Sequence, residues 1–289
     1  MSVSSIFHPE FRQRLEVLKR IVARALAGRG GAGRSPLQER GGRVEFAGHR
    51  PYASGDEVRS IDWSVYARLE ALVVKEFEAP REAHLLLVLD RSGSMALFDK
   101  DAAALRVAAA LGWLGLAAGA RVACCSRGGA SPWLTAQERF PELLAALEKM
   151  PQGGTADLPA AVERAPALGT GRRTAVIFSD LYEAEPAARA LGVLRRRAGT
   201  VVGAHVVAPE ELRAPDVAAV ALRDAESGEV LRVRLDGATR SRFLAEAEAF
   251  LSGRENLAAR HGARLCRVAP GDDLIAAVER VVVGGEPTP

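Results

Sequence analysis

Residues 84–94 read HLLLVLDRSGS, an apolar run that ends in a carboxylate and continues into two serines. A run of this length without charged residues is typical of a parallel strand that is buried on both faces of its sheet. The loop that follows places three oxygen-bearing side chains, Asp90, Ser92 and Ser94, at alternate positions. Open α/β sheets bind their ligands outside the carboxyl ends of the strands. The stretch therefore predicts a buried strand that carries three polar side chains to a ligand site.

The rest of the chain predicts a doubly wound, mostly parallel α/β sheet, because apolar runs alternate with segments of helical periodicity. The predicted strands are 84–90, 121–126, 174–180, 201–207 and 264–268, and the predicted helices are 102–116, 141–150, 185–197, 240–260 and 274–283. One interruption, near 217–235, has two extended runs joined through the sequence ESGE. It predicts a β-hairpin inserted at an edge of the domain.

Two smaller segments precede this α/β domain, which we place at 83–285. Residues 1–42 predict an amphipathic helix followed by a glycine-rich connector, and residues 43–82 predict a small β-containing module around a polar and aromatic centre. The connector contains a loop, 28–35, that comes within one residue of a phosphate-binding pattern. A phosphate-binding loop needs a strand before it and a helix after it, whereas a helix precedes this loop and Pro36 follows it. We therefore interpret it as a connector.

Composition narrows the possible functions. Apolar residues make up 48% of the chain and charged residues 26%, which is typical of a folded globular protein. The net charge of +3 comes from arginines spread along the chain, so we expect no nucleic-acid partner. The longest uncharged apolar run, 107–120, is shorter than the roughly 20 residues that span a bilayer, and the N-terminus lacks the apolar core of a secretory signal. We expect no membrane span and a cytoplasmic location.

Two more oxygen donors are expected at the same edge of the sheet. The strand 174–180 also ends in a carboxylate, and the glycine loop 153–155 supplies a hydroxyl just before a short helix. The candidate set is Asp90, Ser92, Ser94, Thr155 and Asp180. Mg²⁺ and Mn²⁺ favour six oxygen ligands, so this set predicts a site for Mg²⁺ (or Mn²⁺). The alternative interpretation is that these side chains only form a turn and cap helices.

This set of five residues resembles the metal-ion-dependent adhesion site of von Willebrand factor A-type domains. In that family an aspartate and two serines follow the first strand, a threonine lies in a middle loop, and a second aspartate follows the fourth strand. The resemblance implies a Rossmann-like fold and a metal that binds an acidic side chain of a protein partner.

A narrower resemblance, to the bacterial domains of unknown function catalogued as family 58, covers the chain from about residue 27 to its end. Its carriers are Gly48-His-Arg-Pro-Tyr-Ala-Ser-Gly-Asp-Glu-Val-Arg-Ser-Ile-Asp-Trp63, Ala67-Arg68 and Val74-Lys-Glu-Phe-Glu78. The resemblance implies a partner, an AAA+ ATPase of the MoxR type, in systems that assist the maturation of other proteins. The role of the 55–68 segment stays open.

Two functions compete. The first is a metal-dependent protein-interaction module that is not an enzyme, with Leu97, Phe98 and Tyr182 as candidate anchors for the partner around the metal. The alternative is a metal-dependent, phosphatase-like hydrolase, because a strand ending in aspartate also resembles phosphatases of the haloacid dehalogenase type. Those enzymes carry a second carboxylate two residues later, where this chain has Ser92. We also expect no lysine in a loop at this edge, which leaves the hydrolase without an acid/base partner.

Overall fold

The computed structural model describes residues 10, 13–19, 45–78, 83–169 and 172–283 of the 289-residue chain. Residues 13–19 are helical, and Leu15 and Leu18 are buried in the main core. Most of the predicted N-terminal helix and connector, including the loop 28–35, lies outside the described residues.

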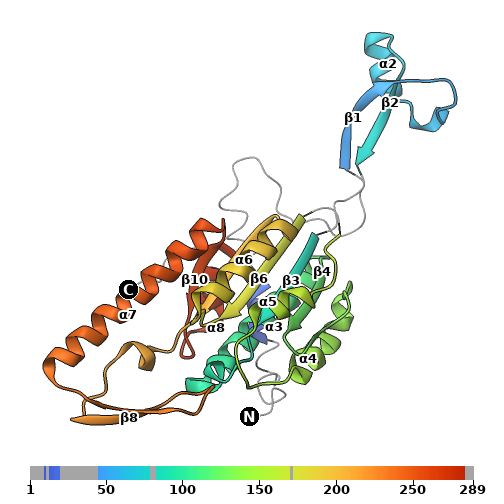
Figure 1. The fold of residues 1–289 in the computed structure, drawn as a ribbon. Coiled ribbons are helices and arrows are strands. Elements are labelled where there is room, and N and C mark those ends of the chain that lie inside the picture. The colour runs from blue at the N-terminus through green and yellow to red at the C-terminus, as the bar shows by residue number, and fades with distance from the viewer. Residues whose placement is uncertain (1–9, 11–12, 20–44, 79–82, 170–171, 284–289) are drawn as a thin grey trace.

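A six-stranded sheet in the order β10-β7-β6-β3-β4-β5 forms the centre of the molecule (Figure 1). Its strands are β3 (Ala83–Leu89), β4 (Arg121–Ser126), β5 (Gly129–Ala130), β6 (Arg172–Ser179), β7 (Thr200–Val206) and β10 (Arg264–Val268). Every neighbouring pair is parallel except β4 with β5. The predicted mostly parallel α/β sheet is confirmed.

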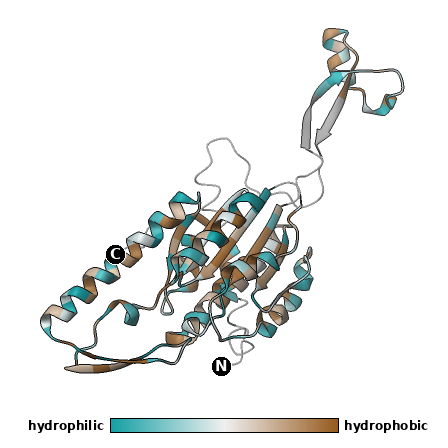
Figure 2. Ribbon diagram, viewed as in Figure 1, coloured by the Kyte–Doolittle hydropathy of each residue, from teal (hydrophilic) through white to brown (hydrophobic). Residues whose placement is uncertain are grey.

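Helices cover both faces of this sheet (Figure 1). The first layer contains α3 (Lys100–Ala117), α4 (Phe140–Lys149) and α8 (Leu274–Val283), and the second contains α5 (Leu158–Glu163), α6 (Ala184–Arg197) and the last turns of α7 (Gly237–Arg260). Side chains alternate along the strands, so Leu87 and Leu89 pack in the first layer while Leu86 and Val88 pack in the second. Figure 2 shows the hydrophobic residues gathered in the strands and in the helices that pack on them.

The predicted hairpin near 217–235 is confirmed as a separate two-stranded sheet of β8 (Ala219–Arg223) and β9 (Val230–Arg234). It lies beyond the carboxyl ends of the central strands, between β7 and α7 (Figure 1). Helix α7 continues from it toward the sheet, and Ala258 is the one buried residue of its 24.

The small module contains β1 (Glu45–Pro51), η2 (Val58–Ser60), α2 (Trp63–Leu69) and β2 (Val73–Glu78). Strands β1 and β2 pair antiparallel, and Asp62 caps α2 by accepting hydrogen bonds from the Ser64 and Val65 amides. Because β2 leads directly toward β3, the module lies at the amino end of the central sheet (Figure 1). Within the described parts of the chain, none of the helices combines the length and the apolarity that a membrane crossing requires.

Candidate functional site

Strands β3 and β6 are neighbours, and their register brings the two predicted aspartates to the same edge of the sheet. Leu89 pairs with Phe178, and the amide of Asp90 donates a hydrogen bond of 2.9 Å to the Phe178 carbonyl. From β3 the chain continues to β4 on one side and then crosses to β6 on the other side of β3. The carboxyl ends of β3 and β6 therefore form the topological switch point of the sheet. Asp90 and Asp180 follow these two strands directly.

The loop after β3 holds Asp90, Ser92 and Ser94 close together. The Ser92 amide donates to Asp90 Oδ1 at 3.0 Å, and the two serine Oγ atoms lie 3.0 Å apart. Asp90 and Ser92 are buried, with 4% and 2% of their surfaces exposed. Asp90 thus forms a turn, but the helix-capping alternative is wrong, because Gly93 and Asp99 occupy the N-cap positions of the helices that follow.

Two backbone hydrogen bonds join this loop to the loop of Thr155. The Gly93 amide donates to the Gly154 carbonyl at 2.8 Å, and the Gly153 amide donates to the Arg91 carbonyl at 2.7 Å. Gly153 and Gly154 both have positive φ values, 100° and 74°, which glycine adopts without steric cost. Thr155 is exposed and lines a narrow crevice that also contains Asp90 and Ser92.

Thr155 is not the cap of the helix that follows it. Asp157 has that role, because its carboxylate accepts a hydrogen bond of 3.0 Å from the Ala160 amide at the start of α5. The alternative interpretation of Thr155 as a simple N-cap is therefore wrong, and its hydroxyl remains available to the crevice.

Asp180 is buried and ion-paired with a lysine that the sequence interpretation missed. Lys100 Nζ lies 2.9 Å from Asp180 Oδ2 and 2.6 Å from Glu211 Oε1, and the lysine is only 1% exposed. The prediction excluded a lysine only from the loops at this edge, and Lys100 lies in a helix. Lys100 is the first residue of α3, and its long side chain extends from there to Asp180 at the carboxyl end of β6.

Asp90, in contrast, has no cationic partner among the described residues. Its Oδ2 accepts a hydrogen bond of 2.7 Å from the Ser179 hydroxyl, which is neutral. Of the nearby cations, Lys100 is shared by two carboxylates, and Arg91 is ion-paired with Asp101 at 2.7 Å. Arg127 lines the same crevice, but its guanidinium donates a hydrogen bond of 3.0 Å to the Gly153 carbonyl. Burial raises the pKa of Asp90, and the neighbouring Asp180 raises it further.

A hard divalent cation fits this donor set. A buried carboxylate without a counter-ion, two hydroxyls 3.0 Å apart and a third hydroxyl in the same crevice are the oxygen chemistry that Mg²⁺ and Mn²⁺ prefer. The described residues contain no group of three or more His, Cys, Asp or Glu side chains suited to a metal, so such a site depends on its hydroxyls. Asp90, Ser92, Ser94 and Thr155 are placed to hold it, while Asp180 is engaged by Lys100.

The predicted anchors surround this edge and are solvent-exposed. Leu97, Phe98 and Tyr182 are 42%, 49% and 70% exposed, so none of them packs inward. Phe98 and the buried Leu181 adopt positive φ values of 53° and 51°, which are uncommon for such residues. Backbone conformations of this kind often occur where the surrounding structure serves a binding site.

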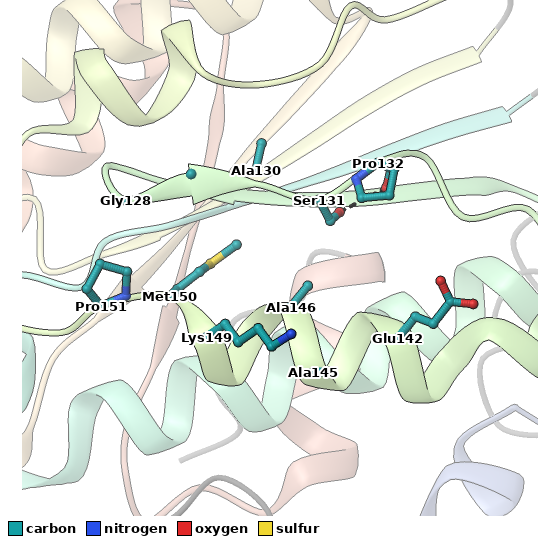
Figure 3. Close-up of a pocket in the computed structure, with 11 residues that line it drawn as sticks. Gly128, Ala130, Ser131, Pro132, Glu142, Ala145, Ala146, Lys149, Met150 and Pro151 are labelled. Carbon is teal, nitrogen blue, oxygen red and sulfur yellow. Dashed lines mark hydrogen bonds between the residues drawn. The ribbon is translucent and has the colours of Figure 1, made fainter.

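A second pocket lies between β5 and α4 (Figure 3). Its lining is Gly128, Gly129, Ala130, Ser131, Pro132, Glu142, Ala145, Ala146, Lys149, Met150 and Pro151. Glu142 on its rim is already ion-paired with Arg139. None of the five predicted metal donors lines it, so it is separate from the crevice at the carboxyl edge.

The fold and this edge define a mixed α/β protein with a polar crevice at the switch point of a mostly parallel sheet. Residues 48–250 match the family described as "Protein of unknown function DUF58", and the chain belongs to that family. Uncharacterized protein Rv1480 of Mycobacterium tuberculosis is 32% identical over 244 residues, which cover 81% of this chain and 77% of that protein. Uncharacterized protein YeaD of Bacillus subtilis is 39% identical over 65 residues, 22% of this chain and 16% of that one.

Two solved structures are similar at low TM-scores. An aerotolerance-related membrane protein from Bacteroides fragilis gives 0.41, with 18% identity over 69% of this chain and 96% of that one. The conserved hypothetical protein BatB from Bacteroides thetaiotaomicron gives 0.39, with 17% identity over 70% of this chain and 97% of that one.

Proposed function

We propose that this chain is a metal-dependent protein-interaction module, a von Willebrand factor A-type domain with a Rossmann-like sheet and a metal-ion-dependent adhesion site. Asp90, Ser92, Ser94 and Thr155 would hold Mg²⁺ (or Mn²⁺), with Asp180 beside them. The observation that carries the proposal is the buried Asp90 carboxylate, which shares a crevice with Ser92 and Thr155 and is ion-paired with no cation among the described residues. Ser94 lies 3.0 Å from Ser92, measured between their Oγ atoms. An unpaired buried charge is costly, and a divalent cation would compensate it.

The donor set also supports metal-mediated binding of an acidic side chain of a partner protein. One carboxylate and neutral hydroxyls offset only part of the charge of a divalent ion, so the bound metal would attract a Glu or Asp side chain from another protein. The exposed Leu97, Phe98 and Tyr182 around the crevice would supply apolar contacts that a single metal–carboxylate bond lacks. The partner we propose is a MoxR-type AAA+ ATPase, on the strength of the family resemblance of residues 48–78.

A pull-down of the ATPase by the full chain tests this function. We expect wild type to retain the ATPase in Mg²⁺ and to release it in chelator, and the Ser92→Ala/Ser94→Ala variant to retain none in either. The matched control is Ser241→Ala/Ser252→Ala, which removes two exposed hydroxyls from α7 and should behave as wild type. If the ATPase is retained in chelator and by the Ser92→Ala/Ser94→Ala variant, the metal does not mediate its binding.

The hydrolase alternative gains support from one observation, the lysine beside Asp180. Haloacid dehalogenase-type phosphatases need a cation there, but they also need a carboxylate at the position of Ser92, which this chain lacks. We therefore expect no turnover of phosphate esters by the purified chain in Mg²⁺. A phosphatase rate that disappears in Asp90→Asn would favour the hydrolase instead.

A further inference from the structure

The turn of the β8–β9 hairpin is an ordered, acidic structure. Asp224 Oδ1 accepts hydrogen bonds from the Glu226 and Ser227 amides, and the Asp224 amide donates to the Glu229 carbonyl at 2.8 Å. Gly228 completes the turn with a φ of 76°. The turn therefore has a defined shape and presents Glu226 in a fixed position.

That position is between the two loops that carry the candidate metal donors. Glu226 Oε2 accepts a hydrogen bond of 3.2 Å from the Ala156 amide, next to Thr155. On the other side, a Cβ added to Gly93 would lie 2.7 Å from the Ala225 carbonyl oxygen and 3.5 Å from Glu226 Cγ. Glu226 thus binds the loop of Thr155, while the adjacent Ala225 carbonyl approaches the loop of Ser92 and Ser94, and the absence of a side chain at Gly93 makes this approach possible.

The charge of Glu226 matters because these loops already carry the Asp90 carboxylate. Asp90 is already a buried carboxylate without a cationic partner among the described residues, and the hairpin brings a second carboxylate to the same loops. Two carboxylates on the same pair of loops repel each other, and a cation held by these loops would attract both of them.

We propose that Glu226 is the chain's own acidic ligand for this metal site, occupying the position that a partner's Glu or Asp would take. The inference rests on the proposed metal site and deepens it. The hairpin forms a sheet of its own, so its turn can leave the crevice without breaking any pairing of the central sheet. A partner would bind by displacing Glu226, and the hairpin would set how strongly a competing carboxylate must bind.

Mn²⁺ binding to the full chain, followed by electron paramagnetic resonance and water-proton relaxation, tests the inference. Glu226→Gln keeps an oxygen for the Ala156 amide and removes the charge. We expect it to weaken Mn²⁺ binding about tenfold and to add one exchangeable water to the bound ion. The matched control, Glu229→Gln in the same turn, should bind as wild type does.

A second variant moves the turn without changing any acidic residue. Gly93 has φ −60° and ψ −36°, which suit alanine, but the new Cβ of Gly93→Ala would displace the Ala225 carbonyl. We expect the same additional water in this variant. If wild type and all variants bind Mn²⁺ with equal affinity and equal hydration, Glu226 is not a ligand although the metal site stands. If wild type binds no Mn²⁺, both proposals fall.

Discussion

At the scale of single residues, the ion pairs at the carboxyl edge of the sheet were the feature least predictable from the sequence. The pattern of apolar runs and the D-x-S-x-S spacing predicted where Asp90 and Asp180 would meet, because parallel neighbouring strands end at one edge. No local pattern marks Lys100 or Glu226, since each arrives from a segment distant in sequence and its role depends on the tertiary arrangement.

Lys100→Met tests the importance of the buried ion pair. The substitution leaves Asp180 and Glu211 without their shared cation, and breaking a buried pair in this way costs about 3–5 kcal/mol. We expect a loss of about that size in the free energy of unfolding measured with urea. Lys149→Met, at an exposed position on α4, should change it by less than about 0.5 kcal/mol. A loss below about 1 kcal/mol in Lys100→Met would mean that water reaches the two carboxylates.

The three cysteines should be unreactive in the folded chain. Burial raises the pKa of Cys124 and of Cys266 to about 11 and that of Cys125 to about 12, so almost no thiolate exists at neutral pH. We expect no reaction with an aromatic disulfide reagent at pH 8 until denaturant is added, when all three thiols should react. Rapid modification of one native thiol would contradict the buried positions.

The buried His205 should make the free energy of unfolding smaller in mild acid. Burial lowers its pKa from 6.5 to about 4, so the unfolded chain binds a proton that the folded chain does not bind between these values. Stability from this group is therefore complete above about pH 6.5 and is lost as the pH falls toward 4. We expect its contribution to fall by about 2 kcal/mol between pH 7.5 and pH 5. His205→Gln should show a correspondingly smaller pH dependence in urea unfolding; equal dependence would contradict this assignment.

At the scale of elements, the sequence predicted the existence of the strands better than their ends. Helix α3 begins at Lys100 rather than at 102, and α7 begins at Gly237 rather than at 240 because Asp236 caps it through the Thr239 amide. The sequence predicts an extended run at 43–46, whereas strand β1 extends to Pro51, because pairing with β2 tolerates a register shift between Phe46 and Gly48. Such ends are set by caps and pairings that periodicity does not report.

The end of helix α2 offers a stability test of the small module. Glu70 is its C-cap and has φ 53° and ψ 20°, a left-handed conformation that glycine adopts more readily. We expect Glu70→Gly to raise the free energy of unfolding of the module by about 0.5–1 kcal/mol. The measurement is urea unfolding followed by the fluorescence of Trp63, which lies in the same helix. Glu57→Gly, at an N-cap with φ −65°, is the control and should not stabilise it. Equal effects of the two substitutions would contradict the conformational explanation.

At the scale of the whole molecule, the family-specific module and the candidate metal site lie at opposite ends of the sheet (Figure 1). The module exposes Trp63 and Leu69, at 55% and 73%, and the other end exposes the anchors around the crevice. The domain order and the role of the candidate donors remain predictions from the sequence. It could not predict that the hairpin turn packs on the donor loops, because that contact joins residues 93, 156 and 226 across the fold.

The most direct test of the proposed function is Mg²⁺ calorimetry on the full chain with and without Asp90. We expect one binding site in wild type and in the control Asp216→Asn, whose carboxylate is exposed and does not line the crevice. Asp90→Asn should bind no Mg²⁺ while its circular dichroism stays that of wild type, because the amide keeps the shape of the side chain and removes its charge. Equal Mg²⁺ affinity in wild type and Asp90→Asn would contradict the metal site and the metal-dependent partner binding proposed from it.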